Sequence, residues 1–405
     1  MTGGEIILNA KLFGGMLMIA GTCIGGGMLG LPIATASGGL LASGLLFIGC
    51  WMLMSFTALL TLEVNLCFPA NSNIISMAKA TLGKPAEILC WTIYLLFLYA
   101  LVAAYIAGGQ DVLLGLLGAI GINLPVWLAG VLFVGVFGSI VSLGTRHVDL
   151  FNRTMMIMKF GALFILMALV ASHVHVETYM SGQAHYLLPV LTVIVTSFGF
   201  SIIVPSLRTY FNDDVRQLRI AILAGSFLPL LCYLAWEAVI FGAIPLQGEA
   251  GLARLMTADQ PVTGLVQSIS YYVSATAVVI LTKGFTSICV LTAFVCVSLG
   301  LSDYLADGMR VTKQGYHHLL VMVVSFLPPL LTAIFYPRAF ILFLGVAGLC
   351  CVLLQALMPA MMAWNVRYTQ CIDTSYQVAG GKFALLLSMA VSLTVMAIST
   401  YYLVV

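Results

Sequence analysis

A cluster of glycines inside a long apolar segment constrains this chain more than any other feature. Residues 12–36 are apolar over a length that suits a membrane-spanning helix, and the seven residues Gly21–Gly27 include four glycines. Each glycine in a helix interior costs about 1 kcal/mol of helix stability relative to alanine. We therefore expect the helix to break there, which a membrane tolerates only where the backbone lines a cavity or is buried in protein.

The composition excludes a soluble domain of appreciable size. Apolar residues make up 62% of the 405 residues and charged residues 7%, whereas soluble domains contain about 25% charged residues. The ten cysteines lie mostly in apolar runs, and no cysteine or histidine spacing is typical of a metal site. We predict no cofactor, no metal, no nucleic-acid partner and no obligatory protein partner, with the lipid bilayer as the surroundings.

Eleven apolar segments are separated by polar or Pro/Gly-rich breaks. They cover residues 12–36, 40–67, 86–109, 124–144, 150–172, 186–209, 218–243, 276–302, 317–336, 339–362 and 382–404. The more polar stretches 71–84 and 261–273 predict short surface helices between spans. We therefore expect an all-α integral membrane protein with eleven transmembrane helices.

The placement of Lys and Arg predicts the orientation, because these residues are enriched in loops on the inner side. With the N-terminus inside, the outer loops hold only Arg254 and Arg338, and Lys159 and Lys283 fall within spans. The inner loops and ends hold the other twelve: Lys11, Lys79, Lys84, Arg146, Arg153, Arg208, Arg216, Arg219, Arg310, Lys313, Arg367 and Lys382. An odd number of spans then places the C-terminus outside.

The spans divide into two halves of five. Residues 1–172 hold the first five spans, residues 186–362 hold the next five, and residues 363–405 add an inner loop and the eleventh span. An odd number of spans per half gives the halves opposite topology. The sixth span has Gly199 followed six residues later by a proline, much as Gly27 precedes a proline in the first. Interrupted helices at corresponding places predict a 5+5 inverted-repeat transporter with its substrate between the first and sixth spans.

The expected substrate-binding residues flank these two interruptions. A helix N-terminus attracts a carboxylate, carbonyls freed by unwinding accept hydrogen bonds from an amine, and phenylalanine faces suit an aromatic side chain. The predicted residues are Thr22, Cys23, Gly25, Gly26 and Gly27 in the first span, and Thr196, Ser197, Phe198, Gly199, Phe200 and Ser201 in the sixth. Close helix packing is the alternative explanation for the glycines, and ordinary span residues for the sixth segment.

Several strings along the chain resemble one transporter family. They are Ala20–Leu29, Thr61–Val64, Val148–Arg153, Thr196–Phe200, Leu299–Asp307, Phe326–Pro329 and Phe335–Arg338. In these strings the chain resembles the hydroxy/aromatic amino acid permeases of the amino acid–polyamine–organocation superfamily. The resemblance implies a leucine-transporter-type fold and proton-driven import of an aromatic amino acid, tyrosine first among them, across the bacterial inner membrane. The chain departs from the family at Ser201, where a histidine is usual.

Ionisable residues at membrane depth are functional candidates. Some proton-coupled relatives in this fold place a fifth-span lysine where sodium-coupled ones hold the ion, so the resemblance makes Lys159 the leading proton-coupling candidate. Its expected neighbours are Thr292 and the carbonyls of Gly21 and Ile24. The alternative is that Lys159 extends its amine to the inner surface. Glu63 in the second span and Glu237 in the seventh are two further candidates for a proton or gating role. The alternative is that both carboxylates lie at the membrane interface.

Three other functions remain as alternatives. Sodium coupling or a broader amino acid specificity is compatible with the same fold, although Lys159 argues against sodium. A channel would lack an occluded site and would not respond to a proton gradient. An enzyme is not expected, because no HExxH, GxSxG or nucleotide-binding loop occurs in the sequence.

Overall fold

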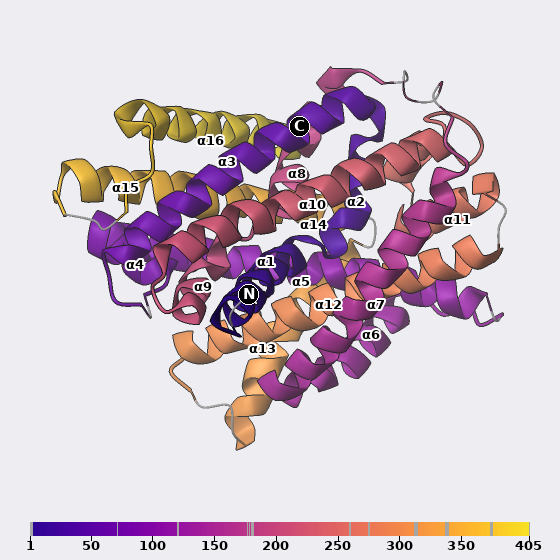
Figure 1. Cartoon of the computed structure of the whole chain (residues 1–405). Coiled ribbons are helices and arrows are strands. Elements are labelled where there is room, and N and C mark those ends of the chain that lie inside the picture. Colours follow the sequence, from indigo (N-terminus) through magenta and orange to yellow (C-terminus); the bar gives the residue numbers. More distant parts are fainter. Residues whose placement is uncertain are drawn as a thin grey trace.

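The computed structural model describes residues 3–70, 72–119, 121–175, 177, 179, 182–258, 261–273, 276–311, 315–336, 340–372 and 376–404. Over these ranges the chain is helical, without a strand (Figure 1). Lys313 and Arg338, which contributed to the predicted orientation, lie outside these residues. For Gly26 and Gly27 the structure gives the backbone but not the degree of burial.

The helices follow the predicted spans closely. The first half contains α1 (Gly3–Cys23), α2 (Gly26–Thr35), α3 (Leu40–Leu66), α4 (Ile74–Leu82), α5 (Lys84–Gly118), α6 (Val126–Ser142) and α7 (Thr145–Ala171). The second contains α8 (Leu191–Ser197), α9 (Val204–Phe211), α10 (Val215–Ala243), α11 (Pro261–Val273), α12 (Thr276–Gly308), α13 (Gly315–Phe335), α14 (Phe340–Cys351) and α15 (Met358–Tyr368), and α16 (Gly381–Val404) follows. Short 3₁₀ helices precede α8 (Ala184–Val190) and α9 (Ser201–Ile203), and a π-helix (Val352–Leu357) joins α14 to α15.

Within the described residues, nine helical segments are long and apolar enough to cross a membrane. Two shorter apolar helices, Lys11–Cys23 and Val126–Ser142, lie where the first and fourth spans were expected. The two predicted surface helices correspond to α4 and α11. The all-helical membrane architecture is therefore confirmed, whereas the number of crossings, the orientation and the inverted repeat stay predictions.

Local sequence explains why α4 begins and ends where it does. The Asn73 side chain accepts hydrogen bonds from the backbone N–H groups of Ile75 and Ser76, and the Ser76 hydroxyl accepts one from the Asn73 N–H. This reciprocal capping satisfies donors that a helix start leaves unpaired. Gly83 ends the helix at φ +86°, a conformation that glycine adopts without strain, and Pro85 then occupies the first turn of α5.

The predicted breaks in the first and sixth spans are confirmed. Between α1 and α2 the chain leaves the helix at Ile24 and Gly25, and Gly25 is extended at φ −143° and ψ −151°. Between α8 and α9 the α-helix ends at Ser197 and a 3₁₀ turn begins at Ser201. The tenth span is also irregular, because its middle is the π-helix.

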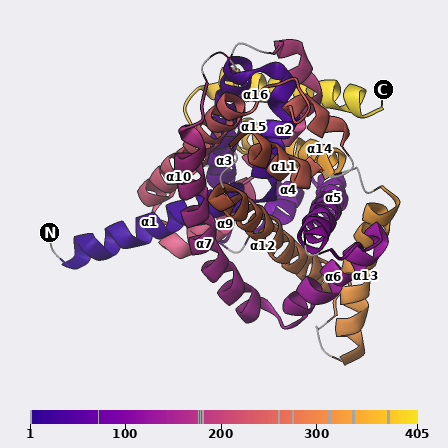
Figure 2. The ribbon, with the colours of Figure 1, turned by 90° about the vertical axis from the view of Figure 1, so that its right-hand side faces the viewer.

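The broken helices lie within the helical bundle. α3 and α10 run side by side, and α1 packs along α10. α12 contacts α5 and α7, while α14 contacts α5 and α8. α2 contacts α8, which brings the first and sixth spans together. The N-terminal end of α1 extends away from the bundle (Figure 2).

Gly348 provides a test of the packing between α14 and α8. A Cβ atom at this position would lie 2.1 Å from the carbonyl oxygen of Thr192, which is backbone and cannot rotate away. We expect Gly348→Ala to push the two helices apart and to destabilise the protein by about 1–3 kcal/mol. Thermal unfolding of the purified protein in detergent measures this effect.

Gly284→Ala in α12 is the matched control, because a Cβ there meets nothing within 4 Å. We expect its melting temperature to equal or exceed that of the unchanged protein, because alanine favours a helix interior more than glycine does. Equal melting temperatures for both variants would contradict the packing.

Candidate functional site

The two helix breaks meet at the hydroxyl of Tyr233. This side chain extends from α10, is fully buried, and lies within hydrogen-bond distance of two carbonyl oxygens. Its hydroxyl donates to the Cys23 carbonyl at 2.7 Å and to the Ser197 carbonyl at 2.9 Å. Cys23 is the last residue of α1, and Ser197 is the last residue of α8. A hydroxyl has one proton and serves one carbonyl at a time, so the pair of carbonyls can accept a further donor.

The start of α2 presents hydrogen-bond donors, whereas the ends of α1 and α8 present carbonyl acceptors. Gly25 precedes the helix and has no side chain with which to cap it. Gly26 and Gly27 form the first turn. The first N–H groups of a helix have no partner within the helix and carry partial positive charge. A Cβ on Gly25 would meet only the Cβ of Ala293, at 3.8 Å, so the backbone is not crowded at this point.

The sixth-span segment is mostly buried. Phe198 lies edge-on to Tyr233, with 5.3 Å between ring centroids, and Phe200 and Ser201 are also buried. The hydroxyls of Thr196 and Ser197 donate to carbonyls of their own helix at Thr192 and Val193. Gly25, Thr196 and Gly199 retain accessible surface, so backbone is open at both breaks.

Of the residues predicted at the first break, Thr22 is the exception. Its side chain is exposed and donates to the Met18 carbonyl within α1. Cys23 is buried, and it takes part through its carbonyl rather than its thiol. The structure therefore brings the two backbones together, whereas substrate binding by Thr22 and by the other predicted residues stays a prediction.

Lys159 lies at the first break rather than at a surface. The side chain extends from α7 and is 1% exposed, and its amine donates to the Ile24 carbonyl at 2.5 Å. This is one of the neighbours predicted from the sequence. Thr292 is buried on α12, but its hydroxyl donates to the Ile288 carbonyl at 2.8 Å. In the described part of the chain no carboxylate lies within ion-pair distance of Lys159.

Glu237 is buried beside the C-terminal end of α2. The Thr35 hydroxyl donates to Glu237 Oε1 at 2.7 Å and to the Leu31 carbonyl at 2.7 Å, so a single proton serves two acceptors. Glu237 Oε2 has no hydrogen-bond partner among the described residues. A proton on the carboxyl would let Glu237 donate to Thr35 while Thr35 donates to Leu31. The geometry suits a carboxyl that binds a proton.

Glu63 has a different environment. Its two oxygens accept hydrogen bonds from Nε and a terminal nitrogen of Arg367, each at 2.6 Å, and Oε2 also accepts the Val378 N–H at 2.8 Å. Both side chains of the ion pair are almost fully buried. This two-pronged pair joins α3 to α15 and to the segment before α16. These contacts favour a structural role for Glu63 over a role in proton transfer.

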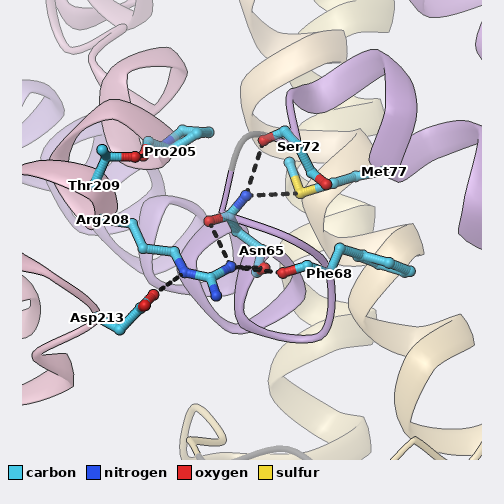
Figure 3. A network of polar contacts seen from close by, with 8 residues as sticks. All are labelled: Asn65, Phe68, Ser72, Met77, Pro205, Arg208, Thr209 and Asp213. Atoms are coloured by element: carbon cyan, nitrogen blue, oxygen red, sulfur yellow. Dashed lines mark hydrogen bonds and ion pairs between the residues drawn. The ribbon is translucent and has the colours of Figure 1, made fainter.

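A second polar network joins α9 to the end of α3 (Figure 3). Arg208 donates to the carbonyls of Asn65 and Phe68, and it pairs with Asp213 at 2.5 Å. The Asn65 amide in turn donates to the Ser72 carbonyl at 3.0 Å. In the predicted orientation this network and the Glu63–Arg367 pair both lie on the inner side, away from the two breaks.

Sequence reasoning missed three residues: Tyr233 and Gln355, which lie at the breaks, and Thr35, which contacts Glu237 at the far end of α2. Tyr233 precedes Glu237 by one helical turn, a spacing that could have suggested a shared face. Gln355 is an amide in an otherwise apolar span, which is itself a signal of function. Thr35 carries no such signal, because a threonine in a span usually bonds to its own helix.

One cavity lies apart from the breaks. It has a volume of about 360 Å³ and lies between α5, α11 and α12. Polar side chains in its lining are Thr263, Gln267, Lys283, Thr286 and Ser287. None of the residues predicted to bind substrate contributes to it.

Comparison with known proteins gives one family over nearly the whole chain. The model of the tryptophan/tyrosine permease family matches residues 8–399. The chain is 33% identical to tyrosine-specific transport system 2 of Haemophilus influenzae, over 97% of each chain. It is 30% identical to the tryptophan-specific transport protein of the same organism, over 93% of this chain and 92% of that one. It is also 28% identical to glutamine transporter 2 of Aliivibrio fischeri, over 94% and 97%.

The buried Glu63–Arg367 pair can be tested against an exposed one. We expect Glu63→Gln to destabilise the protein by about 3–5 kcal/mol, because the Arg367 charge would stay buried without its partner. Glu87→Gln, which removes the exposed pair with Lys79, should change stability by less than about 1 kcal/mol. Denaturation of both variants in detergent compares them, and equal losses would contradict the structural role of Glu63.

Proposed function

We propose, since the chain belongs to the tryptophan/tyrosine permease family, that it imports an aromatic amino acid, tyrosine, by proton symport. Family members are permeases, so the chain is a transporter and not an enzyme, as the sequence predicts. The observation that carries the proposal is the meeting of two broken helices at the Tyr233 hydroxyl. Broken helices that face one another at membrane depth form the substrate site of many secondary transporters.

Each part of an amino acid finds a complementary group in this arrangement. The carboxylate would bind at the N-terminus of α2, where Gly25–Gly27 let it approach the backbone N–H groups. The ammonium would donate to the carbonyls of Cys23 and Ser197, which share the single proton of Tyr233. The aromatic ring would lie along the sixth-span segment that contains Phe198 and Phe200. The relative named as a tyrosine-specific transport system supports tyrosine as the substrate.

Lys159 is the proposed proton carrier. Its ammonium occupies the Ile24 carbonyl at the end of α1, where a coupled cation would otherwise find an oxygen ligand. Loss of the proton would remove the charge of Lys159 and weaken its hydrogen bond to the Ile24 carbonyl. Protonation would therefore be linked to the position of α1. A lysine without a carboxylate partner is suited to gaining and losing a proton. Glu237, with one unpaired oxygen among the described residues, is the second candidate.

The wider architecture belongs to the same proposal. Residues 1–172 and 186–362 would form the two inverted repeats, with the eleventh span outside them. The N-terminus would lie inside and the C-terminus outside. The relatives are bacterial proteins, which supports placement in the bacterial inner membrane.

Uptake into proteoliposomes tests the function. We expect labelled tyrosine to accumulate when an acid exterior is imposed, without sodium, and to be displaced by excess unlabelled tyrosine. A protonophore should abolish accumulation while leaving exchange of tyrosine intact. Accumulation that follows a sodium gradient and ignores the pH gradient would contradict proton symport.

Replacement of Lys159 tests the coupling. We expect Lys159→Ala to lose accumulation driven by the pH gradient, because the titrating group is gone, and to retain tyrosine exchange, because the carbonyls of Cys23 and Ser197 are untouched. Lys283→Ala is the matched control, a span lysine beside the separate cavity, and it should accumulate tyrosine normally. Full accumulation by Lys159→Ala would assign Lys159 a structural role and leave Glu237 as the candidate.

A further inference from the structure

Gln355 is a buried amide at the middle of the tenth span. It lies in the π-helix Val352–Leu357 and is 1% exposed. Its Oε1 accepts a hydrogen bond from the Ser201 hydroxyl at 2.9 Å, which joins the tenth span to the broken part of the sixth. π-Helical turns are rare and occur frequently at functional sites.

The other end of this amide has no partner. Gln355 Nε2 is buried and makes no hydrogen bond among the described residues. A buried polar group left unpaired costs about 1–3 kcal/mol, so an unpaired amide nitrogen beside a helix break is a candidate for a hydrogen bond to a ligand. In the structure the amide oxygen faces the Ser201 hydroxyl, so the nitrogen, with its two hydrogens, is the unpaired atom.

The free nitrogen points to the sixth-span break. It lies 3.4 Å from the position that a Cβ atom would occupy on Gly199, and the Cys351 thiol lies 2.9 Å from that position. Gly199 has accessible surface, whereas its neighbours Phe198 and Phe200 are buried. Because Gly199 has no side chain, the backbone of the break packs directly beside the amide nitrogen and the Cys351 thiol.

We propose that Gln355, oriented by Ser201, determines specificity by donating an N–H to the phenol oxygen of tyrosine. This inference rests on the proposed function and adds the group that recognises the substrate side chain. With its ammonium at the Cys23 and Ser197 carbonyls, a substrate would extend its ring past Gly199 towards Gln355. Gln355 binds the substrate directly, and Ser201 is a positioning residue.

The chemistry distinguishes the aromatic amino acids. A phenol oxygen accepts a hydrogen bond, phenylalanine has no polar atom on its ring, and the indole nitrogen of tryptophan only donates. Phenylalanine would leave the Gln355 nitrogen unpaired in a closed site, and so would tryptophan in the amide orientation of the structure. Sites that hydrogen-bond a substrate hydroxyl reject analogues without it far more strongly than apolar pockets do.

The test compares Vmax/KM for uptake of tyrosine, phenylalanine and tryptophan into proteoliposomes. We expect Gln355→Met, which keeps the side-chain length, to lower the tyrosine-to-phenylalanine ratio about tenfold or more, through the loss of tyrosine uptake alone. Ser201→Ala should lower the same ratio by a smaller factor, because the amide would no longer be held in one orientation. Gln267→Met, on the exposed side of α11, is the matched control and should leave the ratio unchanged.

The outcomes separate this inference from the proposed function. A parallel fall for all three substrates in Gln355→Met, or an unchanged ratio in both Gln355→Met and Ser201→Ala, would overturn the specificity role while import itself stands. If Gln355→Met does not fold, the Ser201→Ala ratio decides the question alone. An unchanged protein that imports all three equally would overturn this inference only, and one that imports none of them would overturn the proposed function as well.

Discussion

Backbone groups released by a broken helix must find partners inside the protein, because the core of a bilayer offers no water. In this chain two buried side chains from other helices meet that requirement at the first break. The Tyr233 hydroxyl serves the Cys23 carbonyl, and the Lys159 amine serves the Ile24 carbonyl. Tyr233 also reaches the Ser197 carbonyl of the sixth span, so a single residue links both breaks. The position of the broken helices therefore depends on α7 and α10.

Two kinds of polar contact in the protein differ in how fully their groups are paired. At the C-terminal end of α3, the Glu63–Arg367 pair and the Arg208 network hold neighbouring helices together through hydrogen bonds to a carboxylate and to carbonyls. Glu237, beside the C-terminal end of α2, and Gln355, beside the sixth-span break, each keep a polar atom without a partner among the described residues. Saturated contacts suit a fixed scaffold, whereas unsaturated ones suit groups that exchange a proton or a ligand.

Much of this arrangement could be predicted from the sequence. The lengths of the apolar segments predicted the helices, because a helix that crosses a bilayer needs about 20 apolar residues. The glycine cluster predicted the break at Gly25, because glycine destabilises a helix locally. The contact of Lys159 with Ile24 came from a family resemblance. Tyr233 and Gln355 could not be assigned partners, since hydrogen bonds between distant helices depend on helix rotation and on the π-helical turn, which the sequence pattern does not encode. The exposure of the Thr22 side chain could not be foreseen for the same reason, because the rotation of the helix decides which residues face the break.

A structure of the protein with bound tyrosine tests the central claim most directly. The account predicts ligand density between the two breaks, with the carboxylate at the start of α2 and the ammonium beside the carbonyls of Cys23 and Ser197. Density confined to the cavity of about 360 Å³ near Lys283 and Gln267, with the breaks unchanged and empty, would contradict it.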